Sequence, residues 1–187
     1  MMNTPKLPFA GLRRVQTLAR WVRALCLLGL ALCVTAPALM WSQPELVAEV
    51  VHRHWGIAEQ APLRLDAMPR LLGLLASLPP SLLLGLALYQ VWALFGRYAS
   101  GDIWCAQSAT HLRRAALALA ALAPALPLSK TLAVLALTLG NPPGQRILHI
   151  GLGLQDLLAL LTGLMLLAVA TVMAEAVRIA EENAEFV

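Results

Sequence analysis

Four long runs of apolar residues, separated by short polar breaks, constrain this chain more than any other feature of its sequence. Each run holds at least 20 residues, and a helix of that length rises about 30 Å, the thickness of a bilayer's hydrocarbon core. Of the 187 residues, 59% are hydrophobic and only 13% are charged, against about 25% charged in a typical globular domain. The sequence therefore predicts an all-α, polytopic membrane protein with four transmembrane helices in an antiparallel bundle, at about 21–40, 70–95, 115–139 and 149–172.

The first run also allows a second interpretation, a cleaved signal peptide. It follows a basic N-terminal region, and Ala36-Pro37-Ala38 is similar to an A-x-A cleavage site. Pro37 falls inside that site, however, and the apolar run continues to Trp41, which favours a retained membrane span. Both interpretations leave the rest of the chain in the same orientation.

Lys and Arg residues are distributed unevenly over the polar segments. Nine lie at the two termini, just inside the start of the first run, or between the second and third runs, and four lie in the other two connections. Because cytoplasmic segments carry the excess of Lys and Arg, both termini are expected in the cytoplasm. The basic residues stand at the edges of the apolar runs, so the net charge of +4 indicates a lipid bilayer surface. We expect no direct nucleic-acid binding.

The polar segments have expected structures of their own. Residues 44–55 are expected to form an amphipathic extracytoplasmic helix, with Ser42 as N-cap, Glu45 completing a capping box and Trp55 as a lipid anchor. Residues 96–114 are expected to form a cytoplasmic loop, and residues 173–187 a cytoplasmic tail that extends the last helix. No linker is evident, so residues 1–187 are interpreted as a single domain.

Motifs typical of enzymes are absent from the sequence, including G-x-S-x-G, H-E-x-x-H, a Walker loop and a dinucleotide-binding G-x-G-x-x-G. We therefore expect a protein that is not an enzyme, with no catalytic residue, no cofactor and no metal site. His52 and His54, completed by Glu49 or His149, are the alternative metal ligands. Their spacing directs them to different sides of a helix, which favours two solvated side chains instead.

Lys130 and Asp156 are the two charges well inside the predicted spans. Lys130 lies nine residues before Leu139, and Asp156 lies seven residues after His149. A difference of two residues is about 3 Å along a helix, so the two are expected at nearly equal depth in adjacent antiparallel helices. The sequence predicts an intramembrane ion pair, which is either a neutralised structural pair or part of an ion pathway.

Two motifs resemble a known family. Tyr98-x-x-Gly101-Asp102-Ile103-Trp104, followed by Leu112-Arg113-Arg114, resembles the Y-x-x-G-E-I-F…L-R signature of the bacterial membrane family catalogued as domain of unknown function 2975. The last residues, 180–187, are similar to that family's terminal L-x-E-E-N-D-L-T-V. Asp102 stands where the family has Glu, and Trp104 where it has Phe. The resemblance implies a four-helix, multi-pass protein of the bacterial inner (cytoplasmic) membrane with unassigned activity. Family members often occur beside helix-turn-helix regulators, which implies such a cytoplasmic partner.

The two motifs carry opposite charges on the same predicted side of the membrane. We expect the acidic tail to dock on the basic loop and to close the inner side of the bundle, through Tyr98, Gly101, Asp102, Arg113, Arg114, Glu181, Glu182 and Asn183. The first functional hypothesis is a structural or regulatory membrane protein acting through a cytoplasmic partner. The alternative is a small transporter or channel subunit that uses the pair of Lys130 and Asp156. A homo-oligomer is compatible with both.

Overall fold

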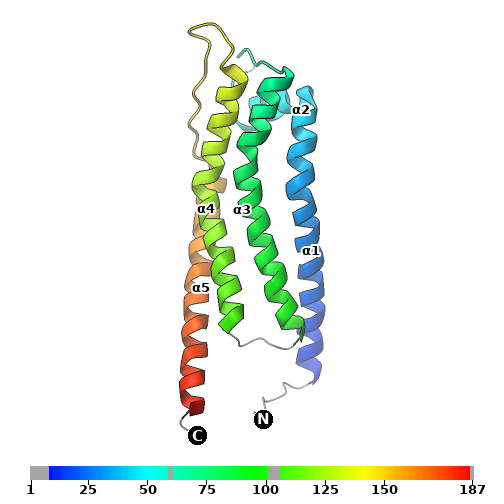
Figure 1. The fold of residues 1–187 in the computed structure, drawn as a ribbon, viewed down its shortest axis with the longest axis vertical. Helices are drawn as coiled ribbons and strands as arrows, with labels where there is room; N and C mark the ends of the chain where they lie inside the picture. The colour runs from blue at the N-terminus through cyan, green and yellow to red at the C-terminus, as the bar shows by residue number, and fades with distance from the viewer. Residues whose placement is uncertain (1–8, 59–60, 101–105, 186–187) are drawn as a thin grey trace.

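The computed structural model describes the backbone of residues 9–58, 61–100 and 106–185 (Figure 1). Its described residues form four long helices and, after the first of them, a short helix and a π-helical turn. Each long helix contains a stretch long and apolar enough to cross a membrane, so the predicted all-α class is confirmed, with four candidate spans. In chain order the elements are α1 (Phe9–Ser42), α2 (Pro44–Glu49), η1 (Val50–His54), α3 (Ala67–Ser100), α4 (Ala106–Thr138) and α5 (Leu154–Glu185).

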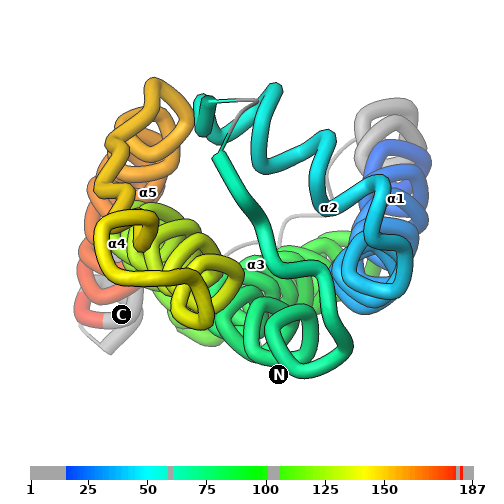
Figure 2. The backbone as a smooth tube through the Cα atoms, turned by 90° about the horizontal axis from the view of Figure 1, so that it is seen from above, coloured from blue at the N-terminus to red at the C-terminus, as the bar shows by residue number. Residues whose placement is uncertain are grey.

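The four long helices run alternately up and down and pack side by side in a curved row. The neighbours in that row are α1 with α3, α3 with α4, and α4 with α5. Seen along the helices, α1 and α5 stand at the two ends of the row, and the row has a concave face (Figure 2). Both chain termini lie at one end of the bundle, called the terminal end below (Figure 1). The opposite end, which carries α2 and η1, is called the capped end.

Close contacts between neighbouring helices set their relative heights. Trp41 of α1 lies so near α3 that a Cβ added to Gly73 would stand 2.0 Å from its indole ring. Between α4 and α5, a Cβ added to Gly163 would stand 2.5 Å from the backbone nitrogen of Ala120. Figure 1 shows that α5 begins well below the capped-end terminus of α1.

The height of α5 places the hydrocarbon layer. Residues 154–173 of α5 are almost all apolar, and 20 helical residues rise about 30 Å, one hydrocarbon thickness. The chain before α5, residues 145–153, is extended and forms no helix or sheet. Backbone without regular hydrogen bonding is excluded from lipid-exposed hydrocarbon, so this segment belongs outside that layer. The last turns of α4 and the first turns of α3 therefore stand beyond the hydrocarbon at the capped end, together with α2 and η1.

The main hydrophobic core of the described residues lies at the capped end. It joins Trp41 to α2, η1, the loop that follows them and the last turns of α4, through Val47, Val51, Ile57, Ala133, Val134 and Leu137. Within the most apolar windows of α1, α3 and α5, by contrast, only 11% of the residues are buried. Apolar side chains must be buried where water surrounds the protein, whereas lipid solvates them directly. The burial pattern thus agrees with the placement of the hydrocarbon layer.

The long helices extend beyond several of the predicted boundaries. The segment predicted as a loop at 96–114 is helical at 96–100 and 106–114, and residues 101–105 lie outside the described residues. Arg, Gln, Ala and Leu are good helix formers, so α3 and α4 do not end where the apolar runs end. Conversely α5 begins at Leu154 instead of 149, because Gly151 and Gly153 disfavour an earlier start.

The predicted helix at 44–55 is present as α2 and η1, but its predicted cap was wrong. Gln43 is the N-cap and makes no side-chain cap hydrogen bond. The Ser42 hydroxyl instead donates to the carbonyl of Leu39 at 2.8 Å, and so belongs to the end of α1. Trp55 is partly buried against the capped-end core, and its role as a lipid anchor stays a prediction. Trp55 packs against a core that includes residues of α4, and this contact is not evident from the local sequence.

Candidate functional site

Asp156 lies at the start of α5 and is almost completely buried, with 4% of its side chain exposed. Its Oδ2 accepts a 2.7 Å hydrogen bond from the backbone N–H of Gly153, the residue before the helix. A carboxylate there satisfies an otherwise unpaired donor and interacts favourably with the positive end of the helix dipole. Its Oδ1 is buried and has no hydrogen-bond partner within the described part of the chain. One oxygen of Asp156 therefore caps α5, and the other is left for an electrostatic partner.

That partner is Lys130 of α4. Its Nζ lies 3.9 Å from Asp156 Oδ1, and 15% of the Lys130 side chain is exposed. The structure thus brings the two predicted residues together, within ion-pair distance but beyond a hydrogen bond. The pair does not lie two turns inside the last span, as counting from 149 suggested, because α5 begins only two residues before Asp156. It stands at the edge of the hydrocarbon layer near the capped end.

An apolar groove adjoins Lys130 on the concave face of the row. It encloses about 600 Å³ and is open along one side. The α1 wall runs from Gly29 to Pro37, and α4 contributes Lys130 at its upper rim. On α3 the lining includes Ser77 and Ser81, two of the small residues that recur along this helix. Small side chains there leave room between the helices, which is why a groove exists at this place.

The helices at the terminal end are joined by polar and aromatic contacts. The guanidinium carbon of Arg23 lies 4.6 Å from the ring centre of Trp92, a cation–π contact between α1 and α3. Gln90 is 5% exposed and its Oε1 lies 2.6 Å from His111 Nδ1, a hydrogen bond between α3 and α4. Sequence reasoning missed both contacts. Gln90 is a lone polar residue in an apolar run, and that signal could have drawn attention to it.

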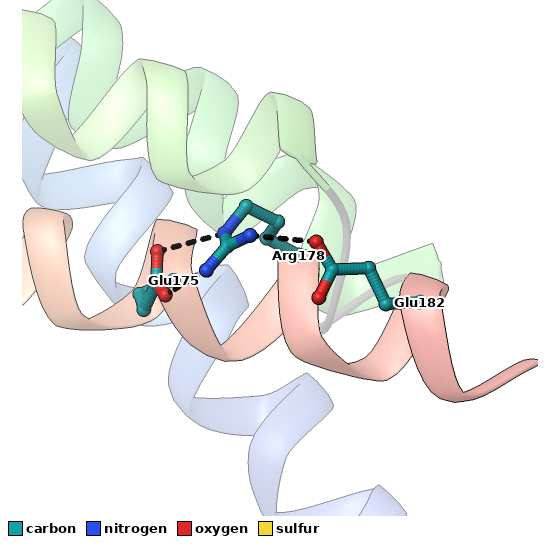
Figure 3. Close-up of polar contacts among 3 residues, drawn as sticks. All are labelled: Glu175, Arg178 and Glu182. Carbon is teal, nitrogen blue, oxygen red and sulfur yellow. Dashed lines mark hydrogen bonds and ion pairs between the residues drawn. The ribbon is translucent and has the colours of Figure 1, made fainter.

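The extension of α5 carries its own network of charges. Arg178 donates through Nε to Glu175 at 3.0 Å and through Nη1 to Glu182 at 2.6 Å (Figure 3). All three side chains are exposed and belong to one helix. Glu182 therefore has a partner within α5, where the sequence predicted a partner in the loop.

The predicted contact between the tail and the loop stays a prediction. Gly101 and Asp102, and the side chains of Glu181 and Asn183, lie outside the described residues. The ring of Tyr98 packs edge-on against Phe95 of the same helix. The two arginines of the motif, Arg113 and Arg114, are exposed on α4.

A second groove lies between α4 and α5 at the terminal end, with a volume of about 540 Å³. Its lining is made mainly of small residues, with Arg113 as its charged member: Ala106, Ala109, Thr110, Leu167, Ala170, Thr171 and Ala174. Ala106 is the first residue of α4, so the part of α5 that follows Ala174 projects beyond the start of α4.

Comparison with known proteins agrees with the motifs described above. A family model described as "Protein of unknown function (DUF2975)" matches residues 15–187, nearly the whole chain. The chain belongs to this family. No curated protein and no solved structure matches the chain. The DUF2975 description assigns no reaction or ligand, and a fold alone does not specify a function.

The described part of the DUF2975 protein contains no assembled metal site. No three His, Cys, Asp or Glu residues are grouped there so as to hold an ion. His149, one of the alternative ligands, accepts through its backbone carbonyl a 2.7 Å hydrogen bond from the Thr131 hydroxyl. This bond helps to fasten the extended segment before α5 to α4.

Proposed function

We propose that this protein is a non-enzymatic protein of the inner membrane that acts through a cytoplasmic partner docking at the terminal end. One observation carries the proposal, the projection of α5 beyond α4 beside the α4–α5 groove. A helix that leaves the bundle with exposed charges offers a rigid surface in water, and the groove next to it offers small residues and Arg113.

The orientation in this proposal rests on the basic residues. Nine Lys and Arg belong to segments at the terminal end and four to segments at the capped end. This bias supports an orientation with the terminal end, and both termini, in the cytoplasm. A helix-turn-helix regulator is the partner class that the family resemblance favours.

The structural roles of two polar side chains support the proposal that the protein is not an enzyme. Asp156 caps α5, and His111 is held by Gln90 between two helices. The two are therefore engaged in holding the fold together.

Site-specific photocrosslinking in living cells tests the proposal. A photoreactive residue at Thr110, in the α4–α5 groove, is expected to capture a soluble protein. The same residue at exposed Arg146, at the capped end, is the matched control and is expected to capture none. Arg113→Glu should abolish the adduct while the protein still inserts in the membrane. Adducts with lipid alone at Thr110, or equal capture at both positions, would rule out a docking site there.

A transporter or channel subunit remains the second candidate because Lys130 and Asp156 adjoin a groove and Asp156 Oδ1 lacks a hydrogen-bond partner among the described residues. The position of the pair near one edge of the hydrocarbon layer makes it the weaker candidate, since an ion must cross the whole layer. Proton or cation flux into liposomes that is lost in Asp156→Asn would favour this second function over the first.

A further inference from the structure

The groove beside Lys130 is about as long as one bilayer leaflet is thick, and it is apolar along its length with a charged group at one end. Along α1 it runs from Gly29 to Pro37, eight residues or about 12 Å, close to the roughly 15 Å of half a hydrocarbon core. Along α4 it runs from Leu122 to Lys130, which pairs with Asp156 in the first turn of α5, where the hydrocarbon layer ends. The groove is therefore apolar from near the middle of the layer to its edge at the capped end, and its ammonium group stands at that edge.

Lys130 is available to an anion in the groove. Asp156 Oδ2 is already used by Gly153, and Oδ1 approaches the ammonium group only to 3.9 Å. Within the described part of the chain, Lys130 makes no hydrogen bond, although an ammonium group has three donors. Its side chain also lines the groove, so those donors are within reach of a group bound there.

The capped end limits what can occupy the groove. Figure 2 shows α2 and the chain after it crossing the capped end of the concave face from α1 towards α5. Trp55, from this crossing segment, lines the groove together with Lys130. A transmembrane helix of another copy or of a partner would have to pass through this cover. A lipid enters sideways from the bilayer and ends at headgroup height, below the cover.

We propose that this groove binds one anionic glycerophospholipid from the leaflet at the capped end. An acyl chain lies along α3 over the small side chains of Ser77 and Ser81, and the phosphate accepts charge-assisted hydrogen bonds from Lys130. The volume of about 600 Å³ is within the range of about 300–1,000 Å³ for small-molecule sites. This inference is independent of the proposed partner at the terminal end.

Native mass spectrometry of the full chain tests the proposal. Protein freed of lipid in a mild detergent is titrated with dioleoyl phosphatidylglycerol or dioleoyl phosphatidylcholine. We expect one phosphatidylglycerol to bind more tightly than all others, and more tightly than phosphatidylcholine. The double variant Lys130→Met with Asp156→Asn removes both charges and leaves no charge alone. It should weaken the binding of phosphatidylglycerol about tenfold, the loss of one charge-assisted hydrogen bond, and remove the preference. Equal binding of the two lipids to the natural protein would overturn the role of Lys130.

A second pair of variants tests the groove itself. Ser81→Phe fills the groove from α3, whereas Leu82→Phe places the same aromatic side chain at the next residue, which is 69% exposed. Ser81→Phe should abolish tight binding of either lipid, and Leu82→Phe should not change it. Unchanged lipid binding in a folded Ser81→Phe protein, or a changed oligomeric state in its place, would show that the groove holds something other than lipid.

A third measurement uses the natural groove and therefore does not depend on whether Ser81→Phe folds. Phosphatidylglycerol with brominated acyl chains should quench the fluorescence of Trp55, taken as the difference between the natural protein and Trp55→Phe. Absence of that quenching at saturating lipid would contradict the proposal.

Discussion

Neutralising the ion pair one residue at a time tests how Lys130 and Asp156 stabilise the fold. Asp156→Asn keeps an oxygen that can accept the bond from Gly153, so the cap of α5 is preserved. Lys130→Met keeps an apolar stem of similar length. The double variant then lacks both charges and retains the shape of both side chains. A comparison of the three isolates the interaction between the charges from the cap and from packing.

The structure predicts unequal effects for the two single variants. Asp156 is 4% exposed and fixed by its bond to Gly153, so without Lys130 its charge has no means of reaching water. Breaking a fully buried pair is destabilising by about 3–5 kcal/mol. The pair of Lys130 and Asp156 is 3.9 Å apart and adjoins a groove, so we expect about 2–3 kcal/mol for Lys130→Met. Asp156→Asn should lose only about 1 kcal/mol, because Lys130 is 15% exposed and can extend towards the headgroups.

Reversible unfolding in mixed micelles, with increasing sodium dodecyl sulfate, measures these free energies. The double variant should be within about 1 kcal/mol of the natural protein, and more stable than Lys130→Met alone, because no lone charge remains. A double variant that loses the sum of the two single effects would show that the charges do not interact, and the reasoning would fail.

Three further predictions concern the helix contacts and the orientation. Gly163→Ala should lower the unfolding free energy by about 1–3 kcal/mol in the same assay, because its Cβ would stand 2.5 Å from the backbone nitrogen of Ala120. Gly85→Ala is the control and should change little, since its nearest neighbour would be an ordinary contact at 3.8 Å. Gln90→Leu should lose about 1–2 kcal/mol with the bond to His111, and no loss would mean that the bond is not formed in the membrane. A C-terminal alkaline phosphatase fusion should be inactive and a C-terminal green fluorescent protein fusion bright, and the reverse pattern would invert the proposed orientation.

The pairing of Lys130 with Asp156 shows how far counting along the sequence can reach. Two charges within apolar runs need a partner, and antiparallel neighbours bring equal distances from a shared turn to equal heights. The partner was therefore predictable. The depth was not, because it depends on residues 145–153 being extended and held against α4 through Thr131 and Thr138. Neither threonine is distinguishable by sequence from others in the spans.

The covered core at the capped end was predicted only in part. The helix at 44–55 was expected from its apolar face, but the packing of Trp55 against the core was not. A side chain with an apolar face packs equally well on lipid or on protein, and only the position of α4 decides between them. For the same reason the sequence does not reveal the groove, which needs α1, α3 and α4 at particular distances.

The sequence by itself determined the number of spans and the helical class. The physical reason is local, since a backbone in hydrocarbon must satisfy its hydrogen bonds within its own segment and needs about 20 apolar residues to cross. The tertiary structure alone decided the order of the helices in the row, the cover over its concave face and the position of Lys130 at the rim of a groove. Lipid solvates every apolar face alike, so the faces of α1, α3, α4 and α5 that meet are selected by close packing at residues such as Gly73 and Gly163.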